Sequence, residues 1–348
     1  MVNQNNYRFV FRNHSSQNYS TFFDRETGLF IRKENSGFPE PFWSESGPEL
    51  LDISITNYCD MSCNFCYRKS GSNGSFMEFS DYEKVVSQAS QLGVLQIALG
   101  GGNPNYHPQF CEFLQMTKKK YGIAVSYTTN GNLLTNSILK FSKEYCGAIA
   151  ISAYYDDSTM ESMVNKIVSY RIKLNIHFLL TSVTINKAIH WLKNPPSFLK
   201  KVNAIVFLNY KPLGRVINQD LLLNNSSSKE SFFKLISEGN YRFKIGFDSC
   251  SISWLVKHIK IDNRFIEPCE AARFSAFIDE KLNMFPCSFY QCTNPPNINK
   301  DSILNIWQNE TTFNSFRRQL NENQCTSKIC FKNCLGGCPI YPEINSIC

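Results

Sequence analysis

Six short apolar runs, separated by segments with helical patterns, constrain the fold of this chain more than any other feature. The runs are 51–56, 94–99, 123–128, 148–153, 174–181 and 204–209. Each is almost continuously apolar, which is typical of a strand with both faces buried. Apolar strands that alternate with helices predict a parallel sheet with right-handed crossovers. Because six repeats are too few to close an eight-stranded barrel, we expect an α/β fold of the open, partial (β/α)6 barrel type. Its site should form at the carboxyl ends of the strands.

The sequence divides into four predicted parts. They are an N-terminal β-hairpin extension (1–50), the partial barrel (51–225), a linker or bridging region (226–268) and a cysteine-rich C-terminal domain (269–348). The hairpin is predicted from two apolar strands that flank a polar turn ending in Gly28. The C-terminal part is irregular apart from one helix predicted at about 301–320. We therefore expect metal ligation, rather than a large core of its own, to organise it.

The 14 cysteines are unevenly placed, with three between residues 59 and 66 and eight between residues 269 and 348. The N-terminus lacks the apolar core of a signal peptide, and no run approaches the roughly 20 apolar residues that span a bilayer. We therefore expect a cytoplasmic protein without a membrane partner, in surroundings that disfavour structural disulfides. Closely spaced thiols in such a chain favour metal ligation.

The strongest motif is Cys59-x3-Cys63-x2-Cys66, which follows the first apolar run directly. Three neighbouring thiolates can hold three irons of a [4Fe-4S] cube and leave the fourth iron open for a substrate or cofactor. A structural zinc site needs four ligands, and no histidine lies close in sequence to complete one. The motif therefore predicts an iron–sulfur cluster with one open iron.

With the aromatic Phe65 before its last cysteine, this triad resembles that of the radical S-adenosylmethionine (radical SAM) superfamily, and the resemblance runs from about residue 51 to the C-terminus. It implies an enzyme in which SAM binds the open iron. An electron from the cluster then cleaves SAM to methionine and a 5′-deoxyadenosyl radical, which abstracts a substrate hydrogen. A flavodoxin- or ferredoxin-type electron donor is implied as a partner. The cofactor supplies the radical chemistry, and the protein supplies orientation and a dry site.

Other positions match the family's SAM-binding elements. They are Gly101, Gly102, Asn103 and Pro104 after the second run, Asn130 after the third, and Ser152 in the fourth. The resemblance implies that these residues contact SAM. Asn103 stands where the family usually has glutamate, and a neutral amide pairs less strongly than a carboxylate with the ammonium of SAM.

The C-terminal cysteines resemble those of the SPASM domain of peptide-modifying radical SAM enzymes, which houses two auxiliary [4Fe-4S] clusters. By resemblance, the first auxiliary cluster would be held by Cys269, Cys287, Cys338 and either Cys250 or Cys292, and the second by Cys325, Cys330, Cys334 and Cys348. Ligation of three such clusters would lower the formal net charge from +7 to about +2. Since no long basic run is present either, we expect no nucleic-acid partner.

The predicted function is modification of a peptide or protein by oxidation, crosslinking or epimerisation. The alternatives are a sulfatase-maturase-like dehydrogenase, a small-molecule radical SAM oxidase and, from another class, a non-catalytic iron–sulfur electron carrier. Residues 1–50 look too short for the winged-helix recognition domain of many such maturases. A separate peptide-recognition protein, or the hairpin itself, would then bind the substrate.

Polar candidates for the substrate site carry a weaker signal. Asp248 could deprotonate a substrate radical or cation, as an aspartate does in some relatives, or it could be a turn or cap residue. Tyr154, Tyr155 and Arg215 fall at predicted strand ends and are candidates for the cavity lining.

Overall fold

A nine-stranded sheet forms the centre of the molecule. The computed structural model describes residues 8–35, 40–223, 227–260, 262, 265–322 and 337–345. The six predicted strands are all present, as β4 (Leu50–Thr56), β5 (Gln96–Gly101), β6 (Ala124–Thr129), β7 (Cys146–Ser152), β8 (Leu174–Leu180) and β9 (Ala204–Asn209). They lie in chain order, and each neighbouring pair is parallel. The predicted partial barrel is therefore confirmed.

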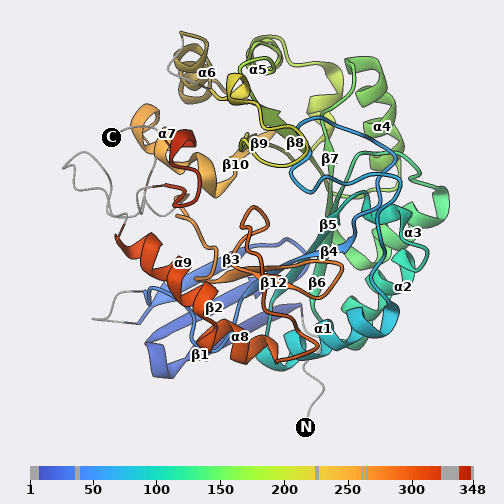
Figure 1. Cartoon of the computed structure of the whole chain (residues 1–348). Helices are drawn as coiled ribbons and strands as arrows, with labels where there is room; N and C mark the ends of the chain where they lie inside the picture. The colour runs from blue at the N-terminus through green and yellow to red at the C-terminus, as the bar shows by residue number, and fades with distance from the viewer. Residues whose placement is uncertain are drawn as a thin grey trace.

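Helices connect these strands along their outer side. They are α1 (Phe79–Leu92), α2 (Phe110–Gln115), α3 (Asn136–Tyr145), α4 (Asp157–Ser169) and α5 (Ile185–Lys193), with short helical turns at Pro104–Tyr106, Met116–Lys120 and Ser197–Lys201. Figure 1 shows α1 to α5 around the outside of the curved sheet. Each helix buries one apolar face, as Tyr82, Val85 and Ala89 of α1 illustrate. The helices therefore leave the inner surface of the sheet free for a site.

The sheet continues beyond β9 into the region predicted as a linker. There the chain forms α6 (Ser227–Glu238), β10 (Lys244–Phe247), a short turn at Ser249–Ser251 and α7 (Ile252–His258). Strand β10 pairs in parallel with β9. The prediction missed this unit because β10 is only four residues long and begins with an exposed lysine. The described residues 227–258 thus extend the alternation of helix and strand.

The opposite edge of the sheet is completed by the C-terminal part of the chain. Strand β11 (Ser275–Ile278) pairs in parallel with β4, and β12 (Met284–Phe285) pairs antiparallel with β11. The predicted helix at 301–320 is two helices, α8 (Ile303–Asn309) and α9 (Thr311–Glu322). Their buried Trp307 and Phe313 belong to the same hydrophobic core as the barrel. The described C-terminal residues therefore share the barrel's core, which the sequence did not predict.

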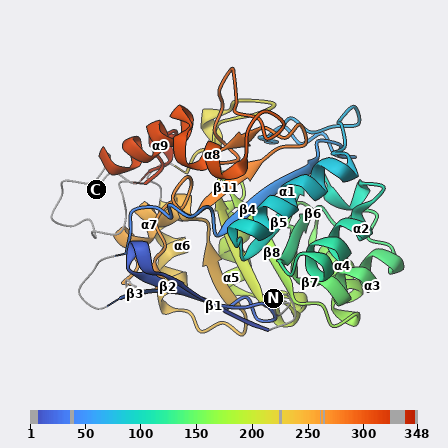
Figure 2. The same ribbon diagram turned by 90° about the horizontal axis from the view of Figure 1, so that it is seen from below.

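A separate three-stranded antiparallel sheet precedes the barrel. It consists of β1 (Phe9–His14), β2 (Tyr19–Asp24) and β3 (Phe30–Glu34), in that order. The predicted hairpin is β2–β3, and β1 is an additional edge strand. Phe23 packs this sheet against Leu95 and Ala124 of the barrel. Figure 2 shows the small sheet at the end of the molecule away from α2 and α3.

Within the described part of the chain, no helix is both long and apolar enough to cross a membrane.

Candidate functional site

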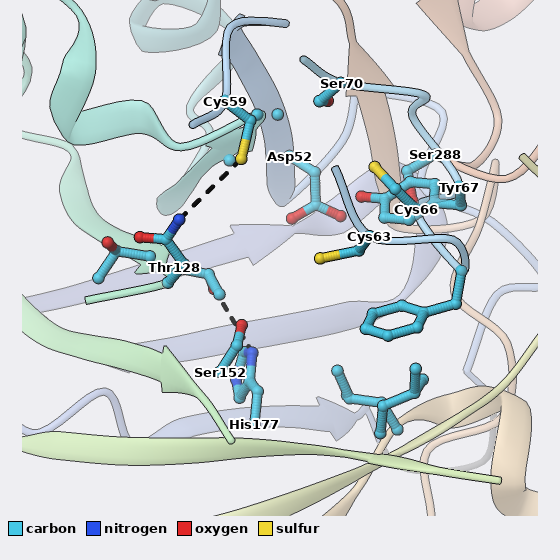
Figure 3. Close-up of a pocket in the computed structure, with 18 of the residues that line it drawn as sticks. Asp52, Cys59, Cys63, Cys66, Tyr67, Ser70, Thr128, Ser152, His177 and Ser288 are labelled. Carbon is cyan, nitrogen blue, oxygen red and sulfur yellow. Dashed lines mark hydrogen bonds between the residues drawn. The ribbon is translucent and has the colours of Figure 1, made fainter. Parts of the chain in front are cut away.

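A cavity of about 400 Å³ lies inside the curve of the sheet, where the strands present their carboxyl ends. Its lining comes from all six barrel strands, from the cysteine loop after β4 and from the C-terminal segment that includes Phe277 and Phe289. Figure 3 shows part of this lining, with the three cysteines, Asp52 and His177 around one space. The predicted location of the site is therefore confirmed.

Cys59, Cys63 and Cys66 all line the cavity and are partly exposed. Their loop is held by its own backbone, since the Cys59 N–H donates to Gly71 O at 3.1 Å and the Cys66 N–H to Cys63 O at 3.1 Å. Burial raises the pKa of the Cys59 and Cys63 thiols above the ordinary value. Metal ligation requires the thiolate, so binding at this loop would release protons.

A second segment braces the cysteine loop from the end of β9. The backbone N–H of Arg215 donates to Cys66 O at 3.0 Å, and its side-chain Nε donates to Cys63 O at 3.1 Å. Gly214 has a φ of 106°, and a Cβ atom there would lie 2.2 Å from Cys66 O. Arg215 therefore holds the loop and does not line the cavity, whereas Tyr154 lines it beside Phe65.

Gly101 and Gly102 line the cavity at the end of β5. A Cβ atom on Gly102 would lie 1.9 Å from Tyr58 O, and one on Gly101 would lie 2.1 Å from Thr56 O. The Gly102 N–H donates to Thr56 O at 2.7 Å. The glycines therefore allow the end of β5 to approach the chain entering the cysteine loop.

Like the two glycines, the predicted SAM contacts Asn130 and Ser152 line the cavity, whereas Asn103 and Pro104 are buried beside it. The Asn103 side chain donates to Asn130 Oδ1 at 2.8 Å and accepts from Thr129 Oγ1 at 2.8 Å. Its amide thus positions Asn130 in this structure, and its predicted contact with SAM stays a prediction.

Asp60 joins this network and had not been singled out from the sequence. It accepts hydrogen bonds from Asn130 Nδ2 at 2.7 Å and Asn132 Nδ2 at 2.6 Å. Burial opposes ionisation, but the hydrogen bonds from Asn132, Asn130 and Tyr106 hold the pKa of Asp60 below its usual range. A fixed carboxylate thus adjoins the first cysteine, and its place between Cys59 and Cys63 was the available signal.

The catalytic candidate Asp248 lies outside the cavity lining. Its Oδ2 accepts from Lys211 Nζ at 2.7 Å and from the Asn209 N–H at 3.1 Å, and its Oδ1 accepts from Ser251 Oγ at 2.6 Å. The structure therefore supports the alternative interpretation of Asp248 as a turn residue. It is Lys211, with a side chain only 3% exposed, that reaches the cavity.

Two titratable side chains in the cavity were missed by the sequence analysis. Asp52 projects from β4, and burial raises its pKa to about 6. His177 projects from β8, and burial lowers its pKa to about 4, so its ring is neutral at pH 7. The signal was alternation within β4, because Asp52 shares an inward face with Ser54 and Thr56 while Leu51 and Ile53 face the core.

Four C-terminal cysteines come together beside this cavity. The Cys250 thiol is hydrogen-bonded to Cys338, and this bond and burial hold the pKa of Cys250 well above its ordinary value. Burial and the nearby Cys250 raise the pKa of Cys269, and they raise that of Cys287 to about 12. Cys292 instead lines a separate surface pocket. Of the two fourth-ligand candidates, the structure places Cys250 in this group.

The remaining predicted ligands, Cys325, Cys330, Cys334 and Cys348, lie outside the described residues.

The three thiols of the cysteine loop supply the donor type that the predicted cluster needs. No three His, Cys, Asp or Glu side chains in the described ranges are placed to hold one metal ion. A single zinc draws its thiolates to about 2.3 Å from one centre, whereas in a [4Fe-4S] cube each thiolate binds its own iron. Three thiols on one short loop beside a cavity therefore fit the cluster predicted there.

This fold and thiol loop together resemble those of iron–sulfur enzymes built on a partial barrel. The sequence profile described as the radical SAM superfamily matches residues 53–187. Residues 53–187 thus match a radical SAM domain, and enzymes of this superfamily use a [4Fe-4S] cluster and SAM.

Curated relatives match over parts of their length. A "Probable GTP 3',8-cyclase" of Pyrococcus horikoshii is 35% identical over 85 residues, which are 24% of this chain and 27% of the relative. A GTP 3',8-cyclase of Vibrio vulnificus is 23% identical over 206 residues, 50% of this chain and 61% of the relative. The chain therefore spans between about a quarter and three-fifths of these relatives.

Solved structures resemble the chain over nearly its whole length. Streptococcus suis SuiB bound to its precursor peptide SuiA superimposes with a TM-score of 0.71 at 14% identity, covering 95% of this chain and 94% of SuiB. Native anSMEcpe with bound AdoMet gives a TM-score of 0.60 at 19% identity, covering 83% of this chain and 88% of that protein. At these identities the similarity shows a shared fold.

Proposed function

We propose that this enzyme applies radical SAM chemistry to a side chain of a peptide or protein. The observation that carries the proposal is the second thiol group, in which Cys250, Cys269, Cys287 and Cys338 converge beside the cavity. A cluster there could take up the electron left after hydrogen abstraction, so a net two-electron oxidation is favoured. The triad cluster and SAM would supply the 5′-deoxyadenosyl radical, and the chain supplies position and a water-poor site.

One charged side chain adjoins both the cavity and the second thiol group. Lys211 lines the cavity, and its positive charge lowers the pKa of Cys250 and of Cys287. Burial and the neighbouring thiols raise both pKa values by more. Although burial opposes it, Asp248 holds the pKa of Lys211 above its ordinary value. A permanently charged lysine therefore lies between the cavity and the second thiol group.

By resemblance to SPASM domains, we assign Cys250, Cys269, Cys287 and Cys338 to a first auxiliary [4Fe-4S] cluster. Cys325, Cys330, Cys334 and Cys348 would hold the second. The all-thiol donor set fits iron–sulfur ligation.

The extent of the structural similarity supports a peptide substrate. SuiB, solved with a precursor peptide, superimposes over 95% of this chain. A flavodoxin- or ferredoxin-type donor would supply the electron. The N-terminal sheet or a separate recognition protein would bind the rest of the peptide.

A small-molecule substrate is the second candidate, because the curated relatives are named GTP 3',8-cyclases. The charges of the cavity argue against a nucleoside triphosphate. Among the described lining residues Lys211 is the sole cation, and it is paired with Asp248, while Asp52 is acidic. An electron carrier would have no need of a 400 Å³ cavity beside its thiols.

The test is anaerobic co-expression of the enzyme with short peptides encoded beside its gene, followed by mass spectrometry. We expect a peptide mass change that requires the intact cysteine triad, and 5′-deoxyadenosine formation by the purified enzyme. Turnover of GTP with no modified peptide would replace this proposal with the small-molecule alternative.

A further inference from the structure

Asp52 is the one carboxylate among the described residues that line the cavity. It lies on β4, between Ala98 of β5 and Phe277 of β11. In the described part of the chain, its carboxylate makes no hydrogen bond or ion pair. Figure 3 shows it directed into the space between the cysteines of the loop.

The cations near Asp52 are already committed to other carboxylates. Lys211 Nζ lies 2.7 Å from Asp248, and an Arg68 nitrogen lies 2.8 Å from Glu280. His177, which faces the same cavity, is held neutral by burial. No positive group among these neighbours therefore offsets the charge of Asp52.

A partly buried carboxylate without a partner is costly, and such a group is stabilised by pairing with a cation. We propose that Asp52 binds a cationic group of the substrate, an ammonium or a guanidinium, inside the cavity. The inference rests on the proposed function and narrows it: the modified peptide presents a basic side chain to the radical. Both the planar guanidinium and the tetrahedral ammonium donate charge-assisted hydrogen bonds to a carboxylate.

The bound cofactor leaves this charge in place. A three-thiolate [4Fe-4S] cluster in its oxidised state would carry about one negative charge, and SAM that binds iron through its amine and carboxylate would be about neutral overall. Asp52 then adds to the negative charge of the cavity. A cationic substrate group would neutralise it.

The test uses the reconstituted, SAM-loaded enzyme and two small probes, 4,4,4-trifluorobutylamine and 4,4,4-trifluorobutan-1-ol, followed by ¹⁹F NMR titration. We expect the amine to bind about 10- to 100-fold more tightly than the alcohol, and Asp52→Asn to remove that preference. Asp52→Glu should retain much of it. Glu112→Gln, which removes an exposed carboxylate on α2, is the matched control and should change neither affinity.

Each outcome is decisive for the assignment. The assignment would be overturned if Asp52→Asn lost affinity for the amine and the alcohol equally, or if it kept the preference for the amine. If the affinity for SAM fell together with the affinity for the amine, Asp52 would be a contact of the cofactor. That result would also overturn the assignment. Iron content and melting temperature show that each variant is folded. If the amine preference depends on Asp52 but no co-expressed peptide is modified, the cation site stands and the peptide substrate falls.

Discussion

The two thiol groups of this molecule are assembled in opposite ways. Cys59, Cys63 and Cys66 come from one eight-residue stretch and are partly exposed on a loop held by backbone hydrogen bonds. The C-terminal group collects thiols from residues 250 to 338 and lies beside the shared hydrophobic core. The first group depends on local geometry with a brace from β9, whereas the second exists only when distant elements have packed.

The largest expected effect separates the two groups directly. Replacing Cys59, Cys63 and Cys66 with alanine should abolish SAM cleavage, because the open iron is lost. Iron bound by the C-terminal cysteines should stay, so the content should fall from about 12 to about eight per chain. Anaerobic iron analysis and chromatography of 5′-deoxyadenosine measure both. Wild-type cleavage in this variant would contradict the assignment of the triad.

A second pair of variants tests how the C-terminal group is built. Cys250→Ala should remove about four irons and leave SAM cleavage by the triad measurable, because Cys250 lies with Cys338 in the buried group. Cys292→Ala is the matched control and should keep full iron, since Cys292 lines another pocket. The reverse result would assign Cys292 as the ligand.

A third test concerns the brace on the first group. Gly214→Ala should cost about 1–3 kcal/mol locally and reduce triad iron, because the new Cβ would strike Cys66 O at a φ of 106°. Gly28→Ala is the control, since Gly28 also has a positive φ of 76° but no atom within 4 Å of its Cβ position. Thermal unfolding and iron analysis compare the two. Equal effects would show that backbone strain alone, without the contact to the loop, is responsible.

The smallest expected effect lies in the amide network beside the triad. Asn103→Leu should weaken SAM binding about 5- to 10-fold, because Asn130 would lose the hydrogen bond that orients it toward Asp60. Asn103→Glu should retain SAM cleavage. Asn175→Leu on β8, which removes the hydrogen bond that Asn175 accepts from Asn203, serves as the control. Unchanged SAM affinity in Asn103→Leu, measured by equilibrium binding, would show that this network does not support the cofactor.

The strands and the triad could be predicted because their signals are local. Each barrel strand is a buried run of six or seven residues, and the triad occupies one loop. Strands β10 and β11 have four residues each. They are strands because they pair with β9 and β4, respectively. Four residues are too few for the alternation of apolar and polar side chains to predict a strand.

The parts of the site that were missed depend on distant partners. Asp248 has the residue type of a base, but its ion pair with Lys211 joins positions 37 residues apart. Asp52 was missed because it lies in a largely apolar run, and its alternation with Ser54 and Thr56 is a short local signal whose direction toward the cavity follows from the neighbouring strands. The preference for Cys250 over Cys292 likewise followed from which thiols the packing brings together.

The pairing of β11 with β4 has a consequence for how the protein is made. Ser54 Oγ donates to Glu280, 226 residues later in the chain, so one edge of β4 stays unpaired while almost all of the barrel is being synthesised. An open parallel edge on a nascent chain is exposed to aggregation until its partner emerges. We therefore expect a truncated product that ends before β11 to be insoluble. The barrel becomes stable only after translation has reached β11.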